Sequence, residues 1–342
     1  MKTAVVILNW NGKKLMEQFL PGVIAHSRNV ATVIVADNAS TDGSVSWLKT
    51  THPEVVIVEN PVNEGYAKGY NDALQKVDAE YFLLLNSDVE VTSGWLEPLI
   101  SYMDQHPATA VCQPKLRWHK HPEQFEYAGA AGGFIDAFGY PFCRGRIFGE
   151  LEIDKGQYNT PTPVFWASGA CMMIRSSVFK KAGGFDDHFF AHMEEIDLCW
   201  RIRNMGYDIF CVPDATVYHV GGATLPKNNP RKTYLNFRNN LSMLYKNLPS
   251  SRLIPVIVVR LLLDGVAGFK FLLQGGIGDC LAVLKAHFHF YERVLKGMYK
   301  RREGAIRNEE QTIYKGNIAW EYFILKKKKF SELHFDPSIK KS

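Results

Sequence analysis

Polar side chains that could bind a metal ion stand directly behind a short apolar run in the first third of the chain. Residues 81–85 read Tyr-Phe-Leu-Leu-Leu and are followed by Asn86, Ser87 and Asp88. Such a run predicts a buried strand, and ligands of open α/β sheets bind beyond the carboxyl ends of such strands. The Asp88 carboxylate and the neighbouring amide oxygens suit Mg²⁺ or Mn²⁺, which in turn neutralises phosphate oxygens. For this triplet alone, an ordinary turn that starts at Asp88 is the simpler alternative.

Side chains at other predicted strand ends and helix starts could bind a nucleotide. Trp10 offers a flat ring for stacking, and the Asp37 carboxylate offers an in-plane acceptor for uracil or thymine. A core position for Trp10 and an Asx-turn at Asp37 are the alternatives. Gly65 and Gly69 lie at a predicted helix start, where backbone amides and the helix dipole favour ribose or diphosphate oxygens. Without companions, these glycines would only indicate a turn.

These side chains require a scaffold of alternating strands and helices. Apolar runs predict strands at residues 3–8, 32–36, 55–58 and 81–85, with helical segments between them. This alternation is typical of a mostly parallel sheet that is covered by helices on both faces. The carboxyl ends of the strands, with their polar loops, would then share one edge of the sheet.

The pattern is less regular in the middle of the chain. Residues 111–163 carry scattered glycines and aromatics, and we expect strands and loops that form a variable pocket wall. Regular elements are then predicted as a strand with a Ser-Gly bend at 164–175, a helix at 194–205 closed by Gly206, and strands at 208–212 and 216–218, with His219 directly after the last.

Length and composition are those of a globular protein. The 342 residues allow one large domain or two, and 46% of them are hydrophobic and 22% charged. The net charge of +5 is mild, so we expect no nucleic acid partner. The excess of positive charge gathers in Lys326–Lys329 and Lys340–Lys341, which could form a solvated tail or a contact with an anionic membrane.

The six cysteines have no Cys-x-x-Cys spacing, which favours a reducing compartment without a zinc site. The apolar run at 4–8 is too short for a signal peptide, so we expect a cytoplasmic location.

One late apolar segment is long enough to span a bilayer. Residues 253–273 are mostly aliphatic but contain Arg260, Asp264 and Lys270. At about 100° per residue, these charges fall within a sector of roughly 120° and leave a wide apolar face. We therefore expect a helix that lies in a membrane interface rather than one that spans it. A core helix packed on the rest of the chain fits the pattern equally well.

Taken in order, five blocks of the chain resemble the family 2 glycosyltransferases of the GT-A fold, especially the bacterial branch with rhamnosyl- and galactofuranosyltransferases. Each block alone is weak evidence, but the ordered set is highly specific and covers about residues 3–245. The blocks are Val-Val-Ile-Leu-Asn-Trp-Asn-Gly at 5–12, Asp-Asn-Ala-Ser-Thr-Asp-Gly-Ser at 37–44, Asn-Glu-Gly-Tyr-Ala-Lys-Gly-Tyr-Asn at 63–71, Leu-Asn-Ser-Asp at 85–88, and Gly-Phe-Asp at 184–186 leading to Glu-Glu-Ile-Asp-Leu at 194–198.

The resemblance implies a metal site at the triplet. Asn-Ser-Asp matches the family's Asp-x-Asp motif with Asn86 in place of the first acid, so Asp88 is the only certain ionic ligand within it. Asp88 would bind Mg²⁺ or Mn²⁺ that bridges the donor diphosphate. His219 stands where related transferases place a metal-binding histidine, although a lone histidine is more often structural. Imidazole suits Mn²⁺ better than Mg²⁺.

The resemblance also implies a catalytic base. Inverting glycosyl transfer needs a base for the acceptor hydroxyl, and in the family this is the Asp of a Glu-Asp pair at a helix start. Here the pair is Glu194 and Glu195, so Glu195 takes the base position with a longer side chain, and Glu194 remains the alternative. Asp186 and Asp197 are assigned to acceptor binding, although Asp197 could instead stabilise its helix and pair with Arg201.

The donor site follows from the same resemblance. The loop at residues 166–170 matches the segment beneath the donor sugar, where Trp166 could face the sugar ring or pack in the core. Arg231, Lys232 and Arg238 lie in a segment that often closes over the diphosphate, although a solvated basic face is the simpler reading. The implied nucleotide- and donor-binding residues are Asn9, Trp10, Asp37, Gly65, Asn71, Asn86, Trp166, Ser168 and Gly169.

Together these expectations describe an α/β protein of GT-A fold. We expect a catalytic domain at residues 1–245, with a nucleotide-binding half at 1–110 and an acceptor half at 111–245, and a helical, basic, membrane-associating region at 246–342. The expected activity is inverting transfer of a sugar from a UDP- or dTDP-sugar to a saccharide or lipid-linked saccharide in cell-surface polysaccharide synthesis, at the inner face of the cell membrane. A sugar nucleotidyltransferase and a non-catalytic saccharide-binding protein are the rival functions.

Overall fold

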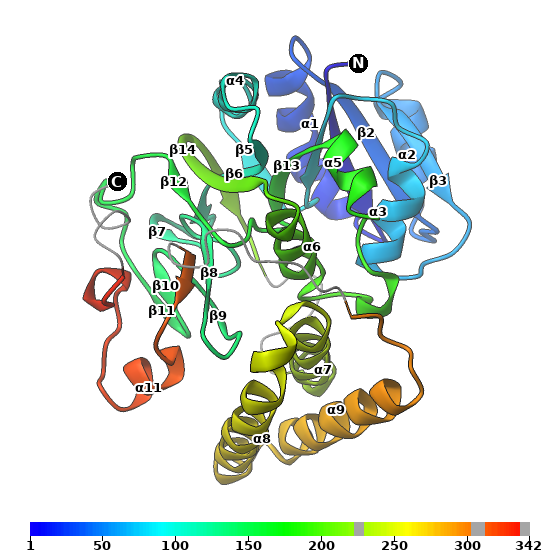
Figure 1. The fold of residues 1–342 in the computed structure, drawn as a ribbon. Helices are drawn as coiled ribbons and strands as arrows, with labels where there is room; N and C mark the ends of the chain where they lie inside the picture. Colours follow the sequence, from blue (N-terminus) through cyan, green and yellow to red (C-terminus); the bar gives the residue numbers. More distant parts are fainter. Residues whose placement is uncertain (222–228, 302–311, 336–342) are drawn as a thin grey trace.

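The structure, a computed structural model, describes residues 1–221, 229–301 and 312–335. Within these ranges a ten-stranded sheet has the order β12-β14-β6-β13-β4-β1-β2-β3 (Figure 1). Its two further strands lie off this path, where β5 pairs with β14 and β7 pairs with β6. The strands predicted in the first quarter of the chain are confirmed, and they pair in parallel. The elements of this part are β1 (Thr3–Asn9), α1 (Lys13–Ser27), β2 (Thr32–Asn38), α2 (Ser44–Thr51), β3 (Val56–Asn60), α3 (Tyr66–Leu74) and β4 (Tyr81–Leu85).

Helices cover both faces of this parallel part because its central strands are apolar on both sides. In β1, Val5 and Ile7 pack with Met16 of α1 on one face. Val6, between them, packs with Tyr70 of α3 on the other face. Because side chains alternate along a strand, each face of β1 packs against one helix.

The second half of the large sheet mixes strand directions. β13 runs antiparallel to β4, and β14 runs parallel to β6. Only Cys171–Arg175 of the strand predicted at 164–175 forms regular structure, and the two strands predicted after residue 207 are one strand with a register shift between Val212 and Thr216, where Pro213 has no N–H to donate. The elements are β5 (Val89–Val91), α4 (Glu97–Gln105), β6 (Thr109–Trp118), β7 (His121–Phe125), β12 (Thr162–Pro163), β13 (Cys171–Arg175), α5 (Ser176–Lys181), η1 (Asp187–Phe189), α6 (Glu194–Asn204) and β14 (Asp208–His219).

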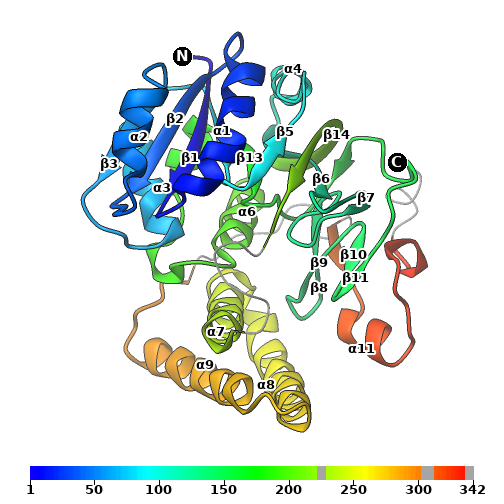
Figure 2. The same cartoon turned by 180° about the vertical axis from the view of Figure 1, so that it is seen from behind.

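A smaller sheet lies beside this second half (Figure 2). Its order is β11-β10-β9-β8-β15, so a strand from the end of the chain completes a sheet from the middle. Phe134 and Phe142 of this sheet pack against Phe330 and Phe335. The end of the predicted C-terminal region is therefore part of this core rather than a separate unit. The elements are β8 (Gly133–Asp136), β9 (Pro141–Cys143), β10 (Arg146–Ile147), β11 (Glu150–Leu151), β15 (Ile313–Tyr314), α11 (Ile318–Phe323) and η2 (Phe330–Glu332).

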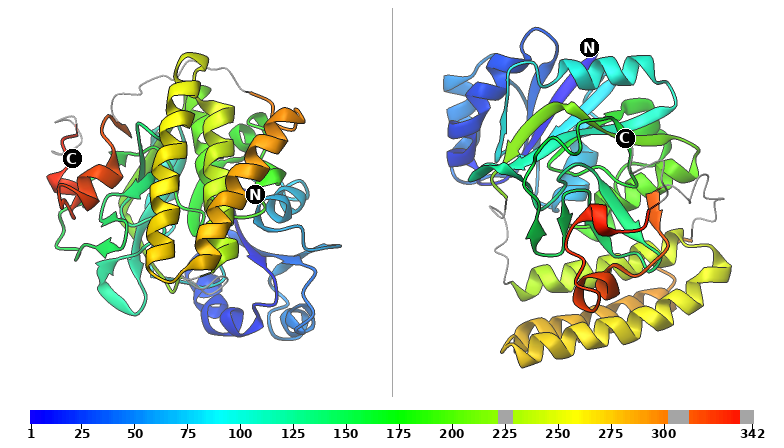
Figure 3. Two further views of the ribbon diagram at one scale, coloured as in Figure 1. Left: turned by 90° about the horizontal axis from the view of Figure 1, so that it is seen from below. Right: turned by 90° about the vertical axis from the view of Figure 1, so that its left-hand side faces the viewer.

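Long helices form a further layer below the sheets. They are α7 (Pro230–Asn247), α8 (Ser250–Leu273) and α9 (Ile277–Leu295). Figure 3 shows α8 and α9 on the side of α7 that faces away from the sheets. The domain boundary predicted at residue 245 falls inside α7. None of the helices in the described part of the chain combines the length and the apolar character that crossing a bilayer requires.

Two charged residues of α8 point toward the protein. Arg260 and Asp264 are 1% and 0% exposed, and they form an ion pair of 3.0 Å. Tyr140 donates a hydrogen bond of 2.8 Å to Asp264, whose other oxygen lies 3.1 Å from Nε2 of His287 in α9. Lys270, which was expected to share this sector, is exposed. The buried ion pair is thus satisfied on all sides, and the apolar side chains of α8 are left to face outward.

Candidate active site

The ends of β1 and β2 bring together the side chains predicted to bind a base. Asn9 and Asp37 are register partners, and Nδ2 of Asn9 donates to Oδ1 of Asp37 at 2.9 Å. The amide of Ser40 donates to the second Asp37 oxygen, which is the Asx-type contact considered above. Trp10 is 53% exposed, so the alternative of a core aromatic is wrong. Its ring is available at the sheet edge for stacking.

The predicted metal ligands Asp88 and His219 meet because β5 pairs with β14. His219 is the register partner of Val89, the residue after Asp88. Both side chains are buried, and Nε2 of His219 lies 3.1 Å from Oδ1 of Asp88. The structure thus brings together two residues that are far apart in the sequence. Their metal-binding role stays a prediction.

A third residue, Glu126, completes this cluster and was not predicted from the sequence. One of its oxygens lies 3.1 Å from Nδ1 of His219. Burial would lower the pKa of His219, but the charges of Glu126 and Asp88 raise it to about 10. Burial likewise opposes ionisation of Asp88, yet the hydrogen bond from His219 holds the pKa of Asp88 below its usual value. The imidazole therefore carries a proton between two carboxylates when no cation replaces it.

The residues present fit a divalent cation only in part. A carboxylate oxygen and an imidazole nitrogen converge, and a carboxylate on the far imidazole nitrogen is the usual way to orient a metal-binding histidine. However, no group of three or more His, Cys, Asp or Glu side chains that could hold a metal ion occurs within the described ranges. The chain thus offers two ligands, and bound phosphate oxygens would have to supply others.

The predicted catalytic carboxylates lie at the first residues of α6. Glu194 is buried and Glu195 is half-buried, and one carboxylate oxygen of each makes no hydrogen bond to any described residue. Burial raises the pKa of Glu195 to about 7. Burial and the charge of Glu195 also raise the pKa of Glu194. A pair of free carboxylates with raised pKa values is suited to accept a proton near neutral pH.

The segment that leads into α6 has a strained backbone. Phe190, His192 and Met193 have φ values of 64°, 70° and 73°, in the left-handed region that non-glycine residues rarely adopt. Asn239 of α7 holds this segment through Nδ2, which donates to the carbonyls of Phe189 at 3.0 Å, Ala191 at 2.9 Å and His192 at 2.7 Å. The sequence offered no signal for this contact. The strain is thus stored beside the catalytic pair.

Arg238 does not match the prediction of a diphosphate contact from a closing segment. It is 5% exposed and donates to the carbonyls of His188 and Phe189 and to Asn239. Arg231 lies over the ring of Phe190 at 5.2 Å. Burial, together with the positive charge of Lys232, lowers the pKa of His192 to about 4.

Short contacts connect the metal-ligand cluster to the catalytic pair. The amide of Asn86 donates to the carbonyl of Ala170 at 2.9 Å. The hydroxyl of Tyr66 donates to the neighbouring Gly169 carbonyl at 2.8 Å. Burial, followed by the charges of Tyr70, Glu194 and Glu195, raises the pKa of Tyr66. Asn86 and Tyr66 are thus both bonded to the loop at Gly169 and Ala170.

Gly65 and Ser168 approach protein atoms rather than open space. A β-carbon on Gly65 would lie 2.6 Å from the Phe190 carbonyl oxygen, which accepts from the amides of Tyr66 and Ala67. The first amides of α3 are thus already bonded, and the expected contact with ribose or diphosphate oxygens is not supported. Ser168 is 1% exposed, and its amide donates to Gln113.

Two of the predicted contacts with sugar are wrong. Trp166 is 3% exposed, and its indole N–H donates to the Phe134 carbonyl at 2.9 Å, so the ring packs in the core and does not face a donor sugar. Asp197 is 0% exposed and accepts hydrogen bonds of 2.8 Å from both Arg201 and Asn247. The anchoring role considered for Asp197 is the one that the structure supports, because no acceptor could reach its oxygens.

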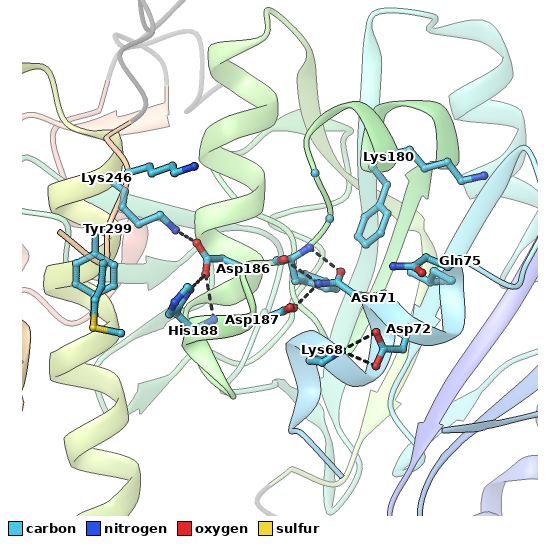
Figure 4. A pocket seen from close by; sticks show the side chains of 17 residues that line it. Lys68, Asn71, Asp72, Gln75, Lys180, Asp186, Asp187, His188, Lys246 and Tyr299 are labelled. Atoms are coloured by element: carbon cyan, nitrogen blue, oxygen red, sulfur yellow. Dashed lines mark hydrogen bonds and ion pairs between the residues drawn. The ribbon is translucent and has the colours of Figure 1, made fainter. Parts of the chain in front are cut away.

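Asn71 and Asp186 line a separate cavity of about 660 Å³ (Figure 4). Asn71 donates to the Phe185 carbonyl and to Asp187, and so ties α3 to the loop before α6. Asp186 forms an ion pair with Lys246, whose charge overcomes the effect of burial and holds the pKa of Asp186 well below its usual value. This cavity is lined by neither the catalytic pair nor Asp88 and His219, so a donor or acceptor role for Asn71 and Asp186 lacks support from the geometry.

Comparison with known proteins decides the family. The model of glycosyl transferase family 2 matches residues 4–183. The chain belongs to this family. Among characterised relatives of this family 2 member is the N-acetylglucosaminyl-diphospho-decaprenol L-rhamnosyltransferase of Mycobacterium tuberculosis, 26% identical over 229 residues, which are 63% of this chain and 75% of the relative.

Solved glycosyltransferases share the fold. The structure of GalNAc-T7 with UDP, GalNAc and Mn²⁺ has a TM-score of 0.55 at 16% identity, and the match covers 71% of this chain and 47% of that chain. The mannosyltransferase PcManGT from Pyrobaculum calidifontis, in complex with GDP-Man and Mn²⁺, has a TM-score of 0.51 at 15% identity and covers 87% of this chain and 81% of that chain. The predicted GT-A fold is confirmed.

Family membership also decides the class of activity. This family 2 protein is a glycosyltransferase, and its rhamnosyltransferase relatives are consistent with a role in cell-surface polysaccharide synthesis. Of the rival functions left open by the sequence, neither the nucleotidyltransferase nor the non-catalytic binding protein is supported. Both solved structures hold Mn²⁺, so a divalent cation is supported for the fold.

Proposed function

We propose that the enzyme transfers a sugar with inversion from a UDP- or dTDP-sugar to a saccharide or lipid-linked saccharide. The observation that carries this proposal is the pair of carboxylates at the start of α6. Glu194 and Glu195 keep oxygens without hydrogen-bond partners among the described residues, and burial raises both pKa values. Ionised carboxylates are costly to bury unpaired, which indicates a catalytic rather than a structural use.

Glu195 is the proposed base. Its carboxylate takes the proton from the acceptor hydroxyl as the oxygen attacks the sugar C1 from the face opposite the leaving group. The new C1–O bond forms while the bond from C1 to the diphosphate oxygen breaks, and the proton stays on Glu195. The strained residues before α6, held by Asn239, fix the position of this carboxylate.

Asp88 and His219 would hold Mg²⁺ or Mn²⁺ in this proposal, with Glu126 orienting the imidazole. When bound, the cation would supply positive charge to the diphosphate that leaves. Asn86 adds an amide oxygen but no charge beside them. Because the imidazole must lose its proton to bind a metal, the cation and the proton compete for His219.

Trp10 and Asp37 would bind the base of the donor, since one offers an exposed ring and the other a fixed carboxylate. Uridine is supported by the UDP in the structure of GalNAc-T7. Thymidine remains in the proposal because relatives are named as rhamnosyltransferases.

The acceptor would be carried by a lipid. The mycobacterial relative is named for an acceptor linked to diphospho-decaprenol. In this chain the outward face of α8 and α9 is apolar, which fits a protein that binds peripherally to the inner membrane face from the cytoplasm. Residues 1–245 would then perform the transfer, while much of 246–342 would contact the membrane. Lys340–Lys341, assigned to this contact above, lie outside the described residues, and Lys327 and Lys328 are paired with Glu321 and Glu150.

The base assignment is tested by paired substitutions. Glu195→Gln keeps size and hydrogen bonding but cannot accept a proton, so we expect it to fold, bind the donor and lose about 10²–10⁴-fold in transfer rate. Glu194→Gln is the matched control and is expected to lose much less. The assay measures UDP or dTDP release with a panel of sugar nucleotides, and donor affinity is measured separately by calorimetry. Normal turnover by Glu195→Gln would move the role to Glu194.

A further inference from the structure

A groove of about 650 Å³ lies between α7 and α9 and ends at Phe190. Residues of α7, including Arg231 and Arg238, line one wall, and Leu281 and Lys285 of α9 line the other. Figure 3 shows these helices side by side, although they are separated by α8 in the sequence. The groove is distinct from the corner formed by Trp10 and Asp37, and no step described above uses it.

The groove is positively charged. Its described lining includes Arg231, Arg238 and Lys285 and no carboxylate. Within the described ranges, Arg231 and Lys285 form no ion pair; they lie over the rings of Phe190 at 5.2 Å and Tyr234 at 5.7 Å. Such positions leave the cationic groups available for an anion.

Arg238 adds a buried charge to the same wall. It is 5% exposed, and its hydrogen bonds go to carbonyl and amide oxygens rather than to a carboxylate. Burial and the nearby positive charge of Arg293 lower its pKa. A buried guanidinium that no carboxylate of the described residues neutralises is costly, so an anion that enters the groove would relieve this cost.

One side of the groove belongs to an apolar surface. Leu281 and Lys285 are exposed residues of α9, and the outward face of α8 continues this surface. Among the exposed residues of α8 and α9, Lys270 and Lys285 are the charged ones, and both are cationic. Large apolar side chains on this face are Ile254, Val258, Leu261, Leu262, Val266, Phe269, Leu272, Leu273, Ile277, Leu281, Leu284, Phe288 and Leu295.

The other end of the groove reaches the loop at residues 189–193, which leads into the catalytic pair and is called the catalytic loop below. Phe190 belongs to the strained segment that leads into Glu194 and Glu195, and its carbonyl accepts from the first amides of α3. A molecule in the groove would thus have an apolar surface on one side and the catalytic carboxylates beyond the other end.

We propose that this groove binds the diphosphate of a lipid-linked acceptor, with Arg231 and Lys285 on the phosphates and the lipid chain on the apolar face of α8 and α9. The proposal rests on the transfer to a lipid-linked saccharide proposed above. A diphosphate matches the groove because several cationic groups converge there and none of them is paired with a carboxylate among the described residues, whereas a neutral lipid would leave them unpaired.

The test measures binding rather than transfer. Farnesyl diphosphate, a short and soluble lipid diphosphate, is titrated into the full-length protein by calorimetry in excess EDTA, so that no cation at Asp88 and His219 can hold the diphosphate. We expect saturable binding that weakens about tenfold or more in Arg231→Ala/Lys285→Ala. The matched control, Lys270→Ala/Lys296→Ala, removes the same charge from outside the groove and is expected to bind normally.

Further ligands separate the possible sources of this binding. Farnesol and inorganic pyrophosphate are each expected to bind more weakly than farnesyl diphosphate, because each lacks one half of the recognised molecule. Equal binding of farnesol, or equal binding by the groove variant and the wild type, would overturn the proposal. It would also fail if the groove variant lost flotation on phosphatidylglycerol vesicles as strongly as it lost farnesyl diphosphate, since the groove would then bind anionic lipids in general.

The same titration separates this proposal from the proposed reaction. Glu195→Gln is expected to bind farnesyl diphosphate normally. If the groove variant lost the ligand while no lipid-linked acceptor were ever glycosylated, the groove would stand and the proposed function would fail. If instead the wild type glycosylates a lipid-linked acceptor and the groove variant binds farnesyl diphosphate as the wild type does, the proposed function would stand and the groove proposal would fail.

Discussion

At the scale of single residues, Glu195 combines a half-buried carboxylate with a pKa that burial raises to about 7. A base must be ionised to accept a proton. We therefore predict that kcat/KM is low below neutral pH, rises through about pH 7 and is level above it. The profile is measured at saturating cation, and the midpoint belongs to the coupled pair of Glu194 and Glu195 rather than to one residue. A rate that is level from about pH 5 to pH 9 would contradict the assignment.

The same raised pKa predicts a change in stability. The usual pKa of this carboxyl is 4.5, so between pH 4.5 and about 7 the folded protein binds a proton that the unfolded chain has lost. Stability contributed by this group therefore falls as the pH rises through that window and is constant above it. Glu195→Gln removes the cost, so its Tm should exceed that of the wild type by roughly 2 °C or more near pH 8, with little difference near pH 4. A Tm difference that is equal at both pH values would show that burial does not raise the pKa of this carboxyl.

Residue roles could be predicted from the sequence only where position along the chain carries the information. Asp88 and His219 each follow a recognisable strand, and the structure brings them to 3.1 Å. Glu126 carries no local signal, because it matters only through contact with His219. The burial of Asp197 likewise depends on Asn247, fifty residues away, which local pattern cannot reveal.

At the scale of elements, α7 acts on the catalytic loop through Asn239. The three carbonyls of Phe189, Ala191 and His192 share its side-chain amide. We predict that Asn239→Ala lowers the free energy of unfolding by about 1–3 kcal/mol, because buried carbonyls lose their donor. It should also reduce kcat by about tenfold or more with little change in the KM for the donor, since Glu195 loses its fixed position.

A matched control for this prediction lies one turn further along the same helix. Ser242 donates to the Arg238 carbonyl at 2.7 Å and lies 2.8 Å from the hydroxyl of Tyr299, and neither partner belongs to the loop. Ser242→Ala should lower stability slightly and leave kcat unchanged. If Asn239→Ala lowered the Tm but kept kcat, the hydrogen bonds from Asn239 to the loop would contribute to folding alone.

Elements with local apolar patterns were the ones that could be predicted. β1 and β4 are short continuous apolar runs, so each strand could be predicted. Their pairing could not, because two other strands separate them in the chain. The smaller sheet could not be predicted, because β8 takes β15 as a partner from nearly 180 residues further along the chain. Its two-residue strands also carry no usable periodicity.

At the scale of the whole molecule, helix α7 connects the catalytic loop with the apolar layer formed by α8 and α9. α7 contacts the catalytic loop through Asn239, and its outer side carries α9 and α8 (Figure 3). α8 reverses the usual arrangement of a helix on a water-soluble protein, because Arg260 and Asp264 face inward while Leu262 and Val266 are each 67% exposed. A face of this kind is stable where its surroundings are apolar, and a bilayer surface beneath α8 and α9 would keep the active site within reach of lipid-linked acceptors.

This arrangement predicts which surface side chains control membrane binding. Leu262→Glu/Phe288→Glu places two carboxylates on the outward face, where both native side chains are about two-thirds exposed and support no core contact. We expect normal folding by circular dichroism and a loss of about tenfold or more in flotation with phosphatidylglycerol vesicles, because apolar insertion is lost and anionic lipids repel the new charges. Val56→Glu/Val62→Glu adds the same charge at exposed valines in β3 and just after it, and should float as the wild type does. Equal flotation of both variants would show that this face does not bind the membrane. A shift from dimer to monomer on gel filtration in the first variant alone would show that the face binds a second copy of the chain instead.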